Sequence, residues 1–505
     1  MMSLLWLQDV CLSLTATPLA CFLLLLVALT LWRIKSIPVT PAVIPGPRGI
    51  PLLGNLLQLG KKPHVTLTDW RFKYGDVYQI TMGSRAAVVL NGVQTIKQAL
   101  VKQAGDFAGR PDFYSFKFIG NGNSMGFGDY GGRWKMHRKI AQNALATFSN
   151  KKSNPIDKTI ATEADVLVSI FLRSSGQPVN PHNEIYLSVG SIICDICFGK
   201  KYKRDDSDFL TLVKLNDEFM AFAGAGNPVD IMPWTRFFTQ RSFNGFLRIL
   251  QLMDTFCKEK LEQHIATYNQ RSIRDVTDCL IRAVHETAAE EKAAVGLTDE
   301  HILTTVQELI GAGFDTIAST LQWAVLYMVT HPDIQEMVYQ EILQVVGKER
   351  QPTLEDLPVL PFTEATILEV MRHSCIFPFA LPHSTTRSTT LYGHRIPEKT
   401  LVFVNLWSVT RDNFYFQEPE AFNPLRFLDS SGQVDRSMVD NFLPYGAGRR
   451  KCPGEFLARM EIFMFFTRLI QTCKMSCAKG DNPIIDSKYG LTLKPLDFNA
   501  VFTPR

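Results

Sequence analysis

The chain has 505 residues, of which 46% are apolar, and its formal net charge is +4 at pH 7. This length and apolar fraction are typical of a globular protein with a large hydrophobic core, and so small a charge argues against nucleic-acid binding. The ten cysteines lack the spacing of a disulfide scaffold, which indicates a reducing compartment. Cys194 and Cys197 have CxxC spacing, but their apolar surroundings favour core cysteines over a zinc or redox site.

The N-terminal segment is strongly apolar. No charged residue occurs from Val10 to Trp32, and a helix of that length spans the ~30 Å hydrocarbon core of a membrane. A cleaved signal peptide is the alternative, but it needs a basic start that this sequence lacks. Arg33 and Lys35 follow the apolar run, so the positive-inside rule places the rest of the chain in the cytosol. We therefore predict a single transmembrane helix, acting as a signal anchor, within residues 1–36.

A proline- and glycine-rich connector over residues 37–55 comes next and cannot form a regular helix. The remaining residues, 56–505, are predicted to form one domain, because no flexible linker, repeat or low-complexity tract divides them. Residues 76–90 alternate like two short strands around Gly83 and Ser84, and residues 400–407 are also strand-like. Residues 309–330 and 455–472 are apolar on most faces, which predicts buried helices. The fold is therefore expected to be mainly α with small β-sheets.

The loop NFLPYGAGRRKCPGEF, residues 441–456, is rich in glycine and cations. It does not match a phosphate-binding loop, because Arg449 follows Gly448 where that motif needs Lys and then Ser or Thr. The loop instead surrounds Cys452 at the start of a predicted helix, where the helix dipole and nearby cations favour a thiolate. A thiolate is either a nucleophile, which needs a histidine base, or a metal ligand. A haem suits a lone cysteine with nearby arginines, because arginine can bind haem propionates through two hydrogen bonds.

Five motifs, in this order along the chain, resemble those of the cytochrome P-450 family of haem-thiolate monooxygenases. They are WKMHR (Trp134 to Arg138), AGFDT (Ala312 to Thr316), EVMR (Glu369 to Arg372), NPLRF (with Arg426) and YGAGRRKCPG (with Cys452). The resemblance covers essentially the whole chain and implies the cytochrome P-450 fold, with a haem-thiolate catalytic domain over residues 56–505. The chain departs from the family at Tyr445, where phenylalanine is usual. A hydroxyl near the thiolate would shift the iron's potential, whereas one turned away would change little.

The resemblance also implies a role for each motif. Cys452 would be the axial ligand of the iron of haem b, and the other residues in contact with the haem would be Trp134, Arg138, His383, Arg450 and Ala312. Asp315 and Thr316 would deliver protons to bound O2 as the catalytic pair. The glycines beside them would leave room for haem and O2, or would serve close helix packing. A buried structural cluster would consist of Glu369, Arg372 and Arg426.

Several segments resemble the vertebrate aryl-hydrocarbon hydroxylase group of the family, family 1. They are GRPDFYSF, AQNALATFS, EFMAFAGAGNPVD, GAGFDT and LPHSTTR. That group has a narrow, flat pocket, so we expect hydrophobic, planar aromatic substrates. The matching pocket positions are Phe127, Phe219, Glu308, Gly311, Phe377, Leu381 and Leu491. Phe127 and Phe219 would stack on a planar ring, although core packing is the alternative. Glu308 replaces a usual aspartate and leaves a steroid hydroxylase as the nearest alternative.

The resemblance implies that one atom of O2 is inserted into the substrate, with electrons from NADPH. The sequence has no GxGxxG nucleotide fingerprint, so the electrons are expected from NADPH–cytochrome P-450 reductase, with cytochrome b5 as a further candidate donor. Cations near the cysteine would meet the acidic surface of the reductase, namely Arg138, Lys139, Arg449 and Lys451. The expected location is the endoplasmic reticulum membrane, with the catalytic domain facing the cytosol. A gas-binding haem sensor and a reductase-independent isomerase or peroxygenase are the alternatives, and the Asp315–Thr316 pair disfavours both.

Overall fold

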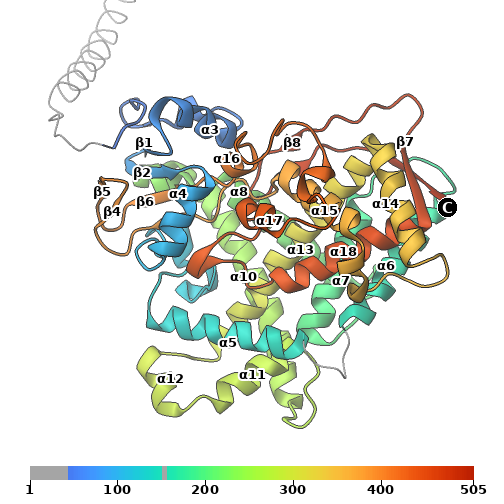
Figure 1. Ribbon diagram of the computed structural model, residues 1–505. Coiled ribbons are helices and arrows are strands. Elements are labelled where there is room, and N and C mark those ends of the chain that lie inside the picture. The colour runs from blue at the N-terminus through green and yellow to red at the C-terminus, as the bar shows by residue number, and fades with distance from the viewer. Residues whose placement is uncertain (1–43, 150–155) are drawn as a thin grey trace, which may run out of the picture.

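The structure is a computed structural model that describes residues 44–149 and 156–505, and the predicted transmembrane helix lies outside these ranges. The described chain is mainly helical with small sheets, as predicted, and Figure 1 shows the helices filling most of the body while a small sheet lies at one side near α3. The α-helices are α2 (Leu56–Leu59), α3 (Pro63–Tyr74), α4 (Val93–Lys97), α5 (Gly132–Ser149), α6 (Ile156–Arg173), α7 (His182–Phe198), α8 (Ser207–Ala225), α9 (Pro228–Ile231), α10 (Arg236–Thr267), α11 (Val276–Glu286), α12 (Ala289–Val295), α13 (Glu300–Thr330), α14 (Pro332–Val345), α15 (Pro361–Ser374), α16 (Trp407–Thr410), α17 (Arg436–Phe442) and α18 (Glu455–Thr472).

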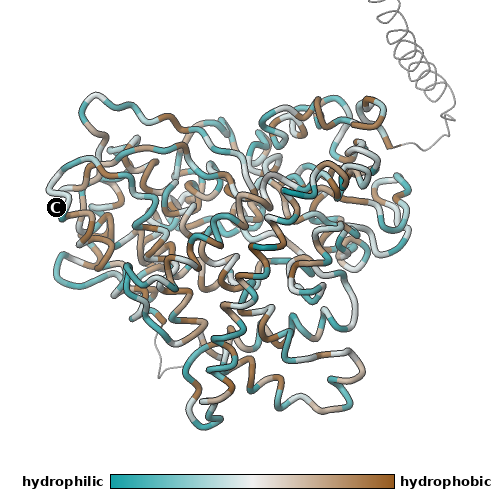
Figure 2. Tube along the Cα trace, turned by 180° about the vertical axis from the view of Figure 1, so that it is seen from behind, coloured by the Kyte–Doolittle hydropathy of each residue, from teal (hydrophilic) through white to brown (hydrophobic). Residues whose placement is uncertain are grey.

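The central helix is α13, which packs against α7, α8, α10, α15 and α18. It begins at Glu300 rather than at the predicted residue 309, because tertiary contacts bury the polar side chains of its first turns, including Thr304 and Thr305. It is the one described helix long and apolar enough to cross a membrane, but 78% of its most apolar window is buried inside the protein. We therefore regard it as a core helix. Figure 2 shows that apolar segments lie within the body and polar ones on the outer loops.

The main sheet has four strands in the order β1-β2-β6-β3. The hairpin of β1 (Val77–Met82) and β2 (Arg85–Leu90) pairs Val77 with Leu90 and turns at Gly83 and Ser84, as the sequence predicted. Strand β6 (Leu401–Val404) lies parallel to β2 and antiparallel to β3 (His383–Ser384). The smaller sheets pair β4 (Thr389–Leu391) with β5 (His394–Ile396), β7 (Cys473–Cys477) with β10 (Ala500–Pro504), and β8 (Ser487–Lys488) with β9 (Lys494–Pro495).

The second half of the proline- and glycine-rich segment packs on the folded body. Ile44 is buried, the Gln79 amide donates to the carbonyl of Pro45 at 2.7 Å, and the Asn55 amide donates to Thr81 at 2.6 Å. At Gly54 the backbone has φ +61°, and a Cβ there would lie 2.1 Å from the Thr81 oxygen. Residues 44–55 of the predicted connector therefore contact the body.

Two helices are joined through a buried histidine. Asp275 caps the start of α11 by accepting a hydrogen bond from the Asp278 amide at 2.9 Å, and it also binds His264 Nε2 near the end of α10 at 2.8 Å. The three side chains lie close enough to hold a metal ion. Asp278, however, pairs with Arg274 through two contacts of 2.8 Å. This group is therefore accounted for as a helix cap and two ion pairs.

The CxxC cysteines are core residues. Cys194 and Cys197 are fully buried in α7, and burial raises the pKa of the Cys197 thiol well above its usual range. Within the described ranges, no cluster of three metal-ligating side chains includes either cysteine. The preference for core cysteines at these positions is in agreement with the structure.

Candidate active site

A cavity of about 650 Å³ lies between α13 and the loop that carries Cys452. It gathers side chains from α5, α8, α10, α13, the segment before β3 and the loop after β8, although these segments are far apart in the sequence. Most residues predicted for the haem and the substrate border it, namely Phe127, Arg138, Phe219, Glu308, Gly311, Ala312, Thr316, Phe377, Leu381, His383, Arg450, Cys452 and Leu491. Trp134 and Asp315 are the two predicted active-site residues that do not border this cavity.

The cysteine loop owes its shape to its glycines. Gly446 and Gly448 have φ values of +71° and +69°, a region that side chains disfavour. A Cβ on Gly448 would lie 1.8 Å from the carbonyl oxygen of Leu100, so the loop backbone packs directly on the neighbouring segment. The Cys452 amide then donates to the carbonyl of Tyr445 at 2.9 Å. The loop therefore presents the sulfur to the cavity just before α18 begins at Glu455.

The cysteine alone does not form a thiolate readily. Burial raises the pKa of the Cys452 thiol, and this outweighs the opposing effects of the Gly454 amide, Arg138 and Lys451. Lys451 is itself paired with Glu455 at 2.6 Å, which weakens its effect on the sulfur. A bound metal ion would supply the missing charge, because coordination deprotonates a thiol.

Three arginines form a cationic end of the cavity. Arg110, Arg138 and Arg450 all border it, and none of them forms an ion pair with a carboxylate within residues 44–149 and 156–505. Burial lowers the pKa of Arg450 to about 9, with partial compensation from Asp129, and it lowers the pKa of Arg110 strongly. Arg110 is buried and the other two are half-buried, and cations withdrawn from water without anionic partners are costly, so this end is suited to an anionic ligand.

Arg110 is a site residue that the sequence reasoning missed. It donates to the carbonyls of Leu381 at 3.0 Å, Pro382 at 2.9 Å and Gly126 at 2.8 Å. It lies within the quoted segment GRPDFYSF, but a lone arginine before a proline gives no signal of burial. His383 is close to it, and its Nδ1 lies 2.6 Å from the carbonyl of Phe107. Burial and the charge of Arg110 lower the pKa of His383 well below its usual range, so this histidine is neutral at pH 7.

Trp134 supports the cationic end from outside the cavity. Its Nε1 donates to the carbonyl of Met125 at 2.8 Å, so the donor expected for a propionate is already used. Its ring lies beneath the guanidinium groups of Arg450, at 4.1 Å, and Arg138, at 5.5 Å. Cation–π contacts of this kind hold both arginines in place.

The two members of the acid–threonine pair face different directions. Thr316 borders the cavity, and its hydroxyl donates to the carbonyl of Ala312 at 2.7 Å. Asp315 is fully buried on another side of α13, where it pairs with Lys494 at 2.6 Å and accepts from Thr492 at 2.5 Å. Lys494 also contacts Asp217 at 3.1 Å. Successive helix residues point ~100° apart, which explains the divergence.

Aromatic side chains line another part of the cavity wall. Phe127 packs edge to face against Phe116, with ring centroids 4.9 Å apart. Phe219 stacks on Phe246 at 6.2 Å, so part of its ring surface is used in packing within the protein. Both rings nevertheless border the cavity. Glu308 borders it too, but its carboxylate accepts hydrogen bonds from the loop at residues 124–126.

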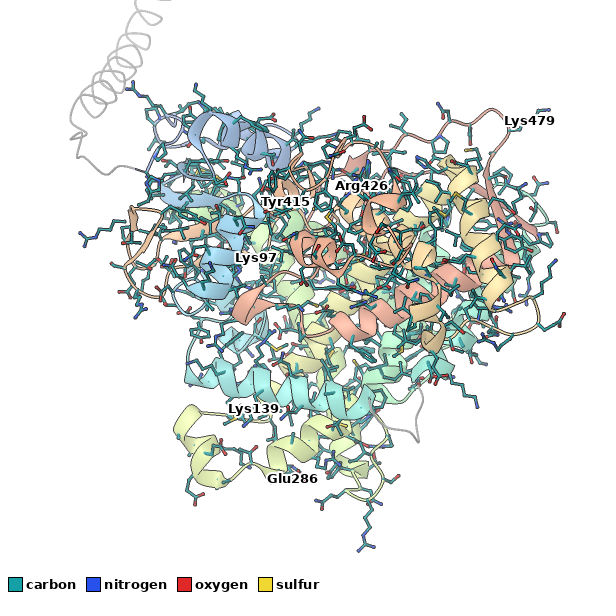
Figure 3. All side chains as sticks on the ribbon, viewed as in Figure 1. Lys97, Lys139, Glu286, Tyr415, Arg426 and Lys479 are labelled. Atoms are coloured by element: carbon teal, nitrogen blue, oxygen red, sulfur yellow. The ribbon has the colours of Figure 1, made fainter. Side chains whose placement is uncertain are left out.

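The predicted structural cluster is present. Glu369 and Arg372 are fully buried and form two hydrogen bonds of 2.7 and 2.8 Å, and Arg426 Nε lies 3.1 Å from Glu369. Arg372 also donates to the carbonyls of Thr410 and Pro419, both at 2.8 Å. The cluster therefore joins α15 to the segments on either side of it. Arg426 is labelled in Figure 3.

Tyr445, the departure from the family pattern, borders the cavity near the sulfur. Its hydroxyl is buried, and the described residues provide no hydrogen-bond partner for it. Burial raises the pKa of this hydroxyl, so the tyrosine is neutral at pH 7.

These features together define a haem-thiolate protein. The Cys452 sulfur on the glycine-rich loop, a cavity with mostly apolar walls and three arginines without carboxylate partners among the described residues fit an iron porphyrin with two carboxylates. The family model for cytochrome P450 matches residues 44–502, and the chain belongs to this family.

Several curated proteins are similar over most of their length. Cytochrome P450 1A5 of Gallus gallus is 42% identical over 484 residues, which cover 93% of this chain and 91% of that relative. Cytochrome P450 1A1 of Rattus norvegicus is 42% identical over 460 residues, and cytochrome P450 1A1 of Platichthys flesus is 41% identical over 462. Each of these two alignments covers 89% of this chain and 88% of the relative.

The resemblance to family 1 that the sequence motifs indicated is thereby confirmed. The protein is a haem-thiolate monooxygenase that binds haem b and uses O2 and electrons from NADPH, which a reductase delivers. The haem supplies the oxidative chemistry, and the protein supplies ligation, protons and placement of a hydrophobic substrate.

Proposed function

We propose that this monooxygenase oxidises planar aromatic compounds, including xenobiotics. The observation that carries the proposal is the aromatic end of the cavity, where Phe127 and Phe219 border the space beside α13. Aromatic walls favour flat ligands because rings stack in offset or edge-to-face arrangements. Phe377, Leu381 and Leu491 complete an apolar surround at the predicted pocket positions.

A spin-state titration of the ferric, haem-loaded protein tests this proposal. We expect pyrene, a flat hydrocarbon, to convert the iron from low to high spin at lower concentration than progesterone does. A shift with progesterone alone would contradict the aromatic proposal and favour a steroid hydroxylase instead. Turnover driven by peroxide without the reductase would favour the peroxygenase alternative.

We also propose residue roles around the haem. Cys452 would be the axial ligand, Ala312 would lie against the porphyrin, and the propionates would meet Arg110, Arg138, His383 and Arg450. Protons would reach the cavity along α13. Asp217 is on the surface, Lys494 links it to Asp315, and Thr316 follows Asp315 at the cavity wall. These contacts support a route from solvent to Asp315, and Thr316, the next residue on α13, would carry protons from there to the cavity.

Replacing Thr316 tests the proton route. In Thr316→Ala we expect NADPH consumption to continue while the product formed per NADPH falls several-fold and peroxide rises, because protons arrive in the wrong place. Thr330→Val is a matched control, since Thr330 makes the same type of bond, to the Leu326 carbonyl at 2.9 Å, at the far end of α13. An unchanged product yield in Thr316→Ala would exclude Thr316 from the route.

For the redox partner we propose the concave surface outside the cysteine loop as the docking site. This surface has a depression of about 840 Å³ bordered by Lys135, Arg138, Lys139, Arg449 and Lys451. Its cations would attract an acidic surface on NADPH–cytochrome P-450 reductase, and cytochrome b5 would compete for the same face.

For the location we propose the endoplasmic reticulum membrane, with residues 1–36 as the anchor, residues 37–55 as the connector and the catalytic domain in the cytosol. Large exposed apolar side chains support a membrane contact, namely Leu52, Leu57, Phe72, Trp234, Phe237 and Phe238. The two groups of residues are close in space, because the turn after β1 bonds to both segments: Gly83 donates to Leu53 at 3.1 Å and Ser84 to Ile231 at 3.0 Å.

A further inference from the structure

One acidic residue on α13 holds the backbone of a short loop, residues 124–128, which we call the Phe127 loop. The two carboxylate oxygens of Glu308 accept hydrogen bonds from the amides of Met125 and Gly126, both at 2.8 Å. The Ser124 hydroxyl donates to the same carboxylate. A carboxylate has about four acceptor positions, so the loop occupies most of the hydrogen-bonding capacity of Glu308.

The hydrogen bonds continue from Glu308 to Phe127. The Ser124 hydroxyl, which donates to Glu308, accepts a hydrogen bond from the Phe127 amide at 2.8 Å. The Gly128 amide then donates to the Ser124 carbonyl at 2.9 Å, which closes the turn. The orientation of Ser124 therefore links the carboxylate on α13 to the backbone that carries the Phe127 ring.

The carbonyl groups of the same loop are held by cations and by Trp134. Arg450 donates to the carbonyls of Met125 at 3.0 Å and Gly128 at 2.8 Å, and Arg110 donates to Gly126 at 2.8 Å. An acid thus binds the amide side of the loop and two arginines bind its carbonyl side. These hydrogen bonds from both sides hold the loop in place between the arginines and the substrate space.

Gly126 allows the acid to come this close. A Cβ at that position would lie 3.2 Å from Glu308 Oε1, which is tighter than ordinary contact. The neighbouring Phe127 ring packs on Phe116 and borders the cavity, so a shift of the loop would move one wall of the substrate space.

We infer that Glu308 determines substrate shape as a positioning residue, because it fixes Phe127 through the Phe127 loop rather than binding the substrate itself. The inference rests on the proposed function, since a rigid Phe127 wall favours flat ligands. Once the loop is released, the Phe127 ring becomes free to retreat, and the cavity accepts thicker molecules.

Ligand titrations of haem-loaded variants test the inference. We measure the ratio of the apparent Kd for progesterone to that for pyrene from the ferric spin-state change. In Glu308→Gln and in Ser124→Ala, which breaks the link but keeps the acid, we expect this ratio to fall about fivefold. Glu300→Gln is the matched control. Glu300 is exposed and also lies on α13, and it accepts a hydrogen bond at 2.7 Å from Asn121, which precedes the Phe127 loop, but it does not touch the loop itself. We expect its ratio to equal that of the wild type.

A double-mutant cycle shows whether Glu308 acts through Phe127. In a Phe127→Leu background, Glu308→Gln should change the ratio no further, because the positioned ring is already absent. If the two changes are instead additive, Glu308 acts on the ligand by another route and the inference is overturned. The inference is also overturned if Glu308→Gln weakens the binding of 1-hydroxypyrene alone while Ser124→Ala leaves that binding unchanged. Glu308 would then bind the substrate directly through a hydrogen bond.

Hydrogen exchange separates the failure of this inference from the failure of the proposed function. The amides of Met125, Gly126 and Phe127 should exchange about tenfold faster in Glu308→Gln than in the wild type and in Glu300→Gln. Unchanged exchange contradicts the role of Glu308 whatever the substrate is. Faster exchange with an unchanged ligand ratio contradicts its role in specificity. If the wild type binds progesterone more tightly than pyrene, the aromatic proposal is contradicted. A change in the ratio of the two Kd values in Glu308→Gln would in that case still support the positioning role of Glu308.

Discussion

At the residue scale, the unpaired arginines of the cavity and Cys452 depend on a ligand that brings both negative charge and a metal. Desolvation lowers the pKa values of Arg110 and Arg450 and raises that of the Cys452 thiol. An iron porphyrin reverses both effects at once, because its propionates face the guanidinium groups while the metal takes the sulfur. The same groups that are unfavourable without the haem therefore favour its binding.

We expect Cys452→Ala to abolish the absorption band that the thiolate gives in the ferrous CO complex, together with turnover, because the proposed ligand on the glycine-rich loop is then lost. Cys477→Ser is the control, since Cys477 lies in β7 outside the cavity and should leave the spectrum intact. Retention of the thiolate band in Cys452→Ala would disprove the assignment of the ligand.

The sequence predicted most of these residues because their motifs are local. It could not predict the surroundings of Asp315, since Thr492 lies 177 positions further along the chain and Lys494 is beyond it. It missed Arg110 for a similar reason: its partners Leu381 and Pro382 are 271 and 272 positions away. Long-range partners of this kind leave no periodic pattern in the sequence.

At the element scale, α13 shows how two neighbouring glycines serve different purposes. A Cβ on Gly313 would lie 2.7 Å from the side chain of Ile193 on α7, whereas a Cβ on Gly311 would have only one neighbour, the Asn216 side chain at 3.6 Å. Close helix packing therefore explains Gly313, and open space beside the cavity explains Gly311.

The two glycines can be compared directly by substitution with alanine. Gly311→Ala should stabilise the protein by up to about 1 kcal/mol through helix propensity, while narrowing the cavity and weakening ligand binding. Gly313→Ala should not be stabilised in this way, because the new methyl group would clash with the side chain of Ile193. Thermal unfolding of both haem-loaded variants checks this expectation, and a Gly313→Ala variant as stable as Gly311→Ala would contradict the packing argument.

The link between α10 and α11 should depend on pH. Burial alone would lower the pKa of His264, but the hydrogen bond to Asp275 and its charge outweigh burial and raise it above its usual value. A raised histidine pKa stabilises the fold fully below pH ~6.5, and this stabilisation is lost as the pH rises through the folded-state value. In His264→Gln we therefore expect a loss of about 2 kcal/mol at pH 6 and a smaller loss at pH 9.

Unfolding temperatures of the wild type and His264→Gln across this pH range are the relevant measurement. His394→Gln serves as a control for general pH effects, because His394 lies in the small β4–β5 hairpin away from this link. A loss in His264→Gln that does not vary with pH would show that the histidine contributes through packing alone.

Helix α18 follows Gly454, and its predicted ends, residues 455 and 472, agree with the structure. The predicted start of α13 does not, because His301, Thr304 and Thr305 look polar in the sequence but are buried by neighbouring helices. Thr305 Oγ1 lies 2.5 Å from Nε2 of His137 on α5, and a contact between such distant residues exists only in the assembled core.

At the scale of the whole molecule, the cationic surface outside the cysteine loop and the exposed apolar side chains beside β1 assign different faces to different partners. The cations of α5 and the cysteine loop border one depression. The apolar group lies around α2, α3 and the start of α10. The body can therefore contact a membrane and a soluble redox domain at the same time.

Charge reversal tests the assignment of the cationic face. Lys139→Glu should raise the KM for the reductase several-fold at low ionic strength, and the difference from wild type should shrink as salt is added, because exposed charges are screened. Lys479→Glu is the control. Figure 3 shows Lys139 on α5 and Lys479 at a distant edge of the body. Equal effects of the two substitutions would contradict a localised docking face.

The short hairpin of β8 and β9 joins two parts of the site that are usually considered separately. Leu491 borders the cavity, whereas Thr492 and Lys494, only a few residues later, hold Asp315. A ligand too thick for the cavity would displace Leu491 and pull these two partners with it. Molecular fit and the yield of product per NADPH should therefore vary together across a series of substrates, so that the poorest-fitting compounds also waste the most reducing equivalents as peroxide.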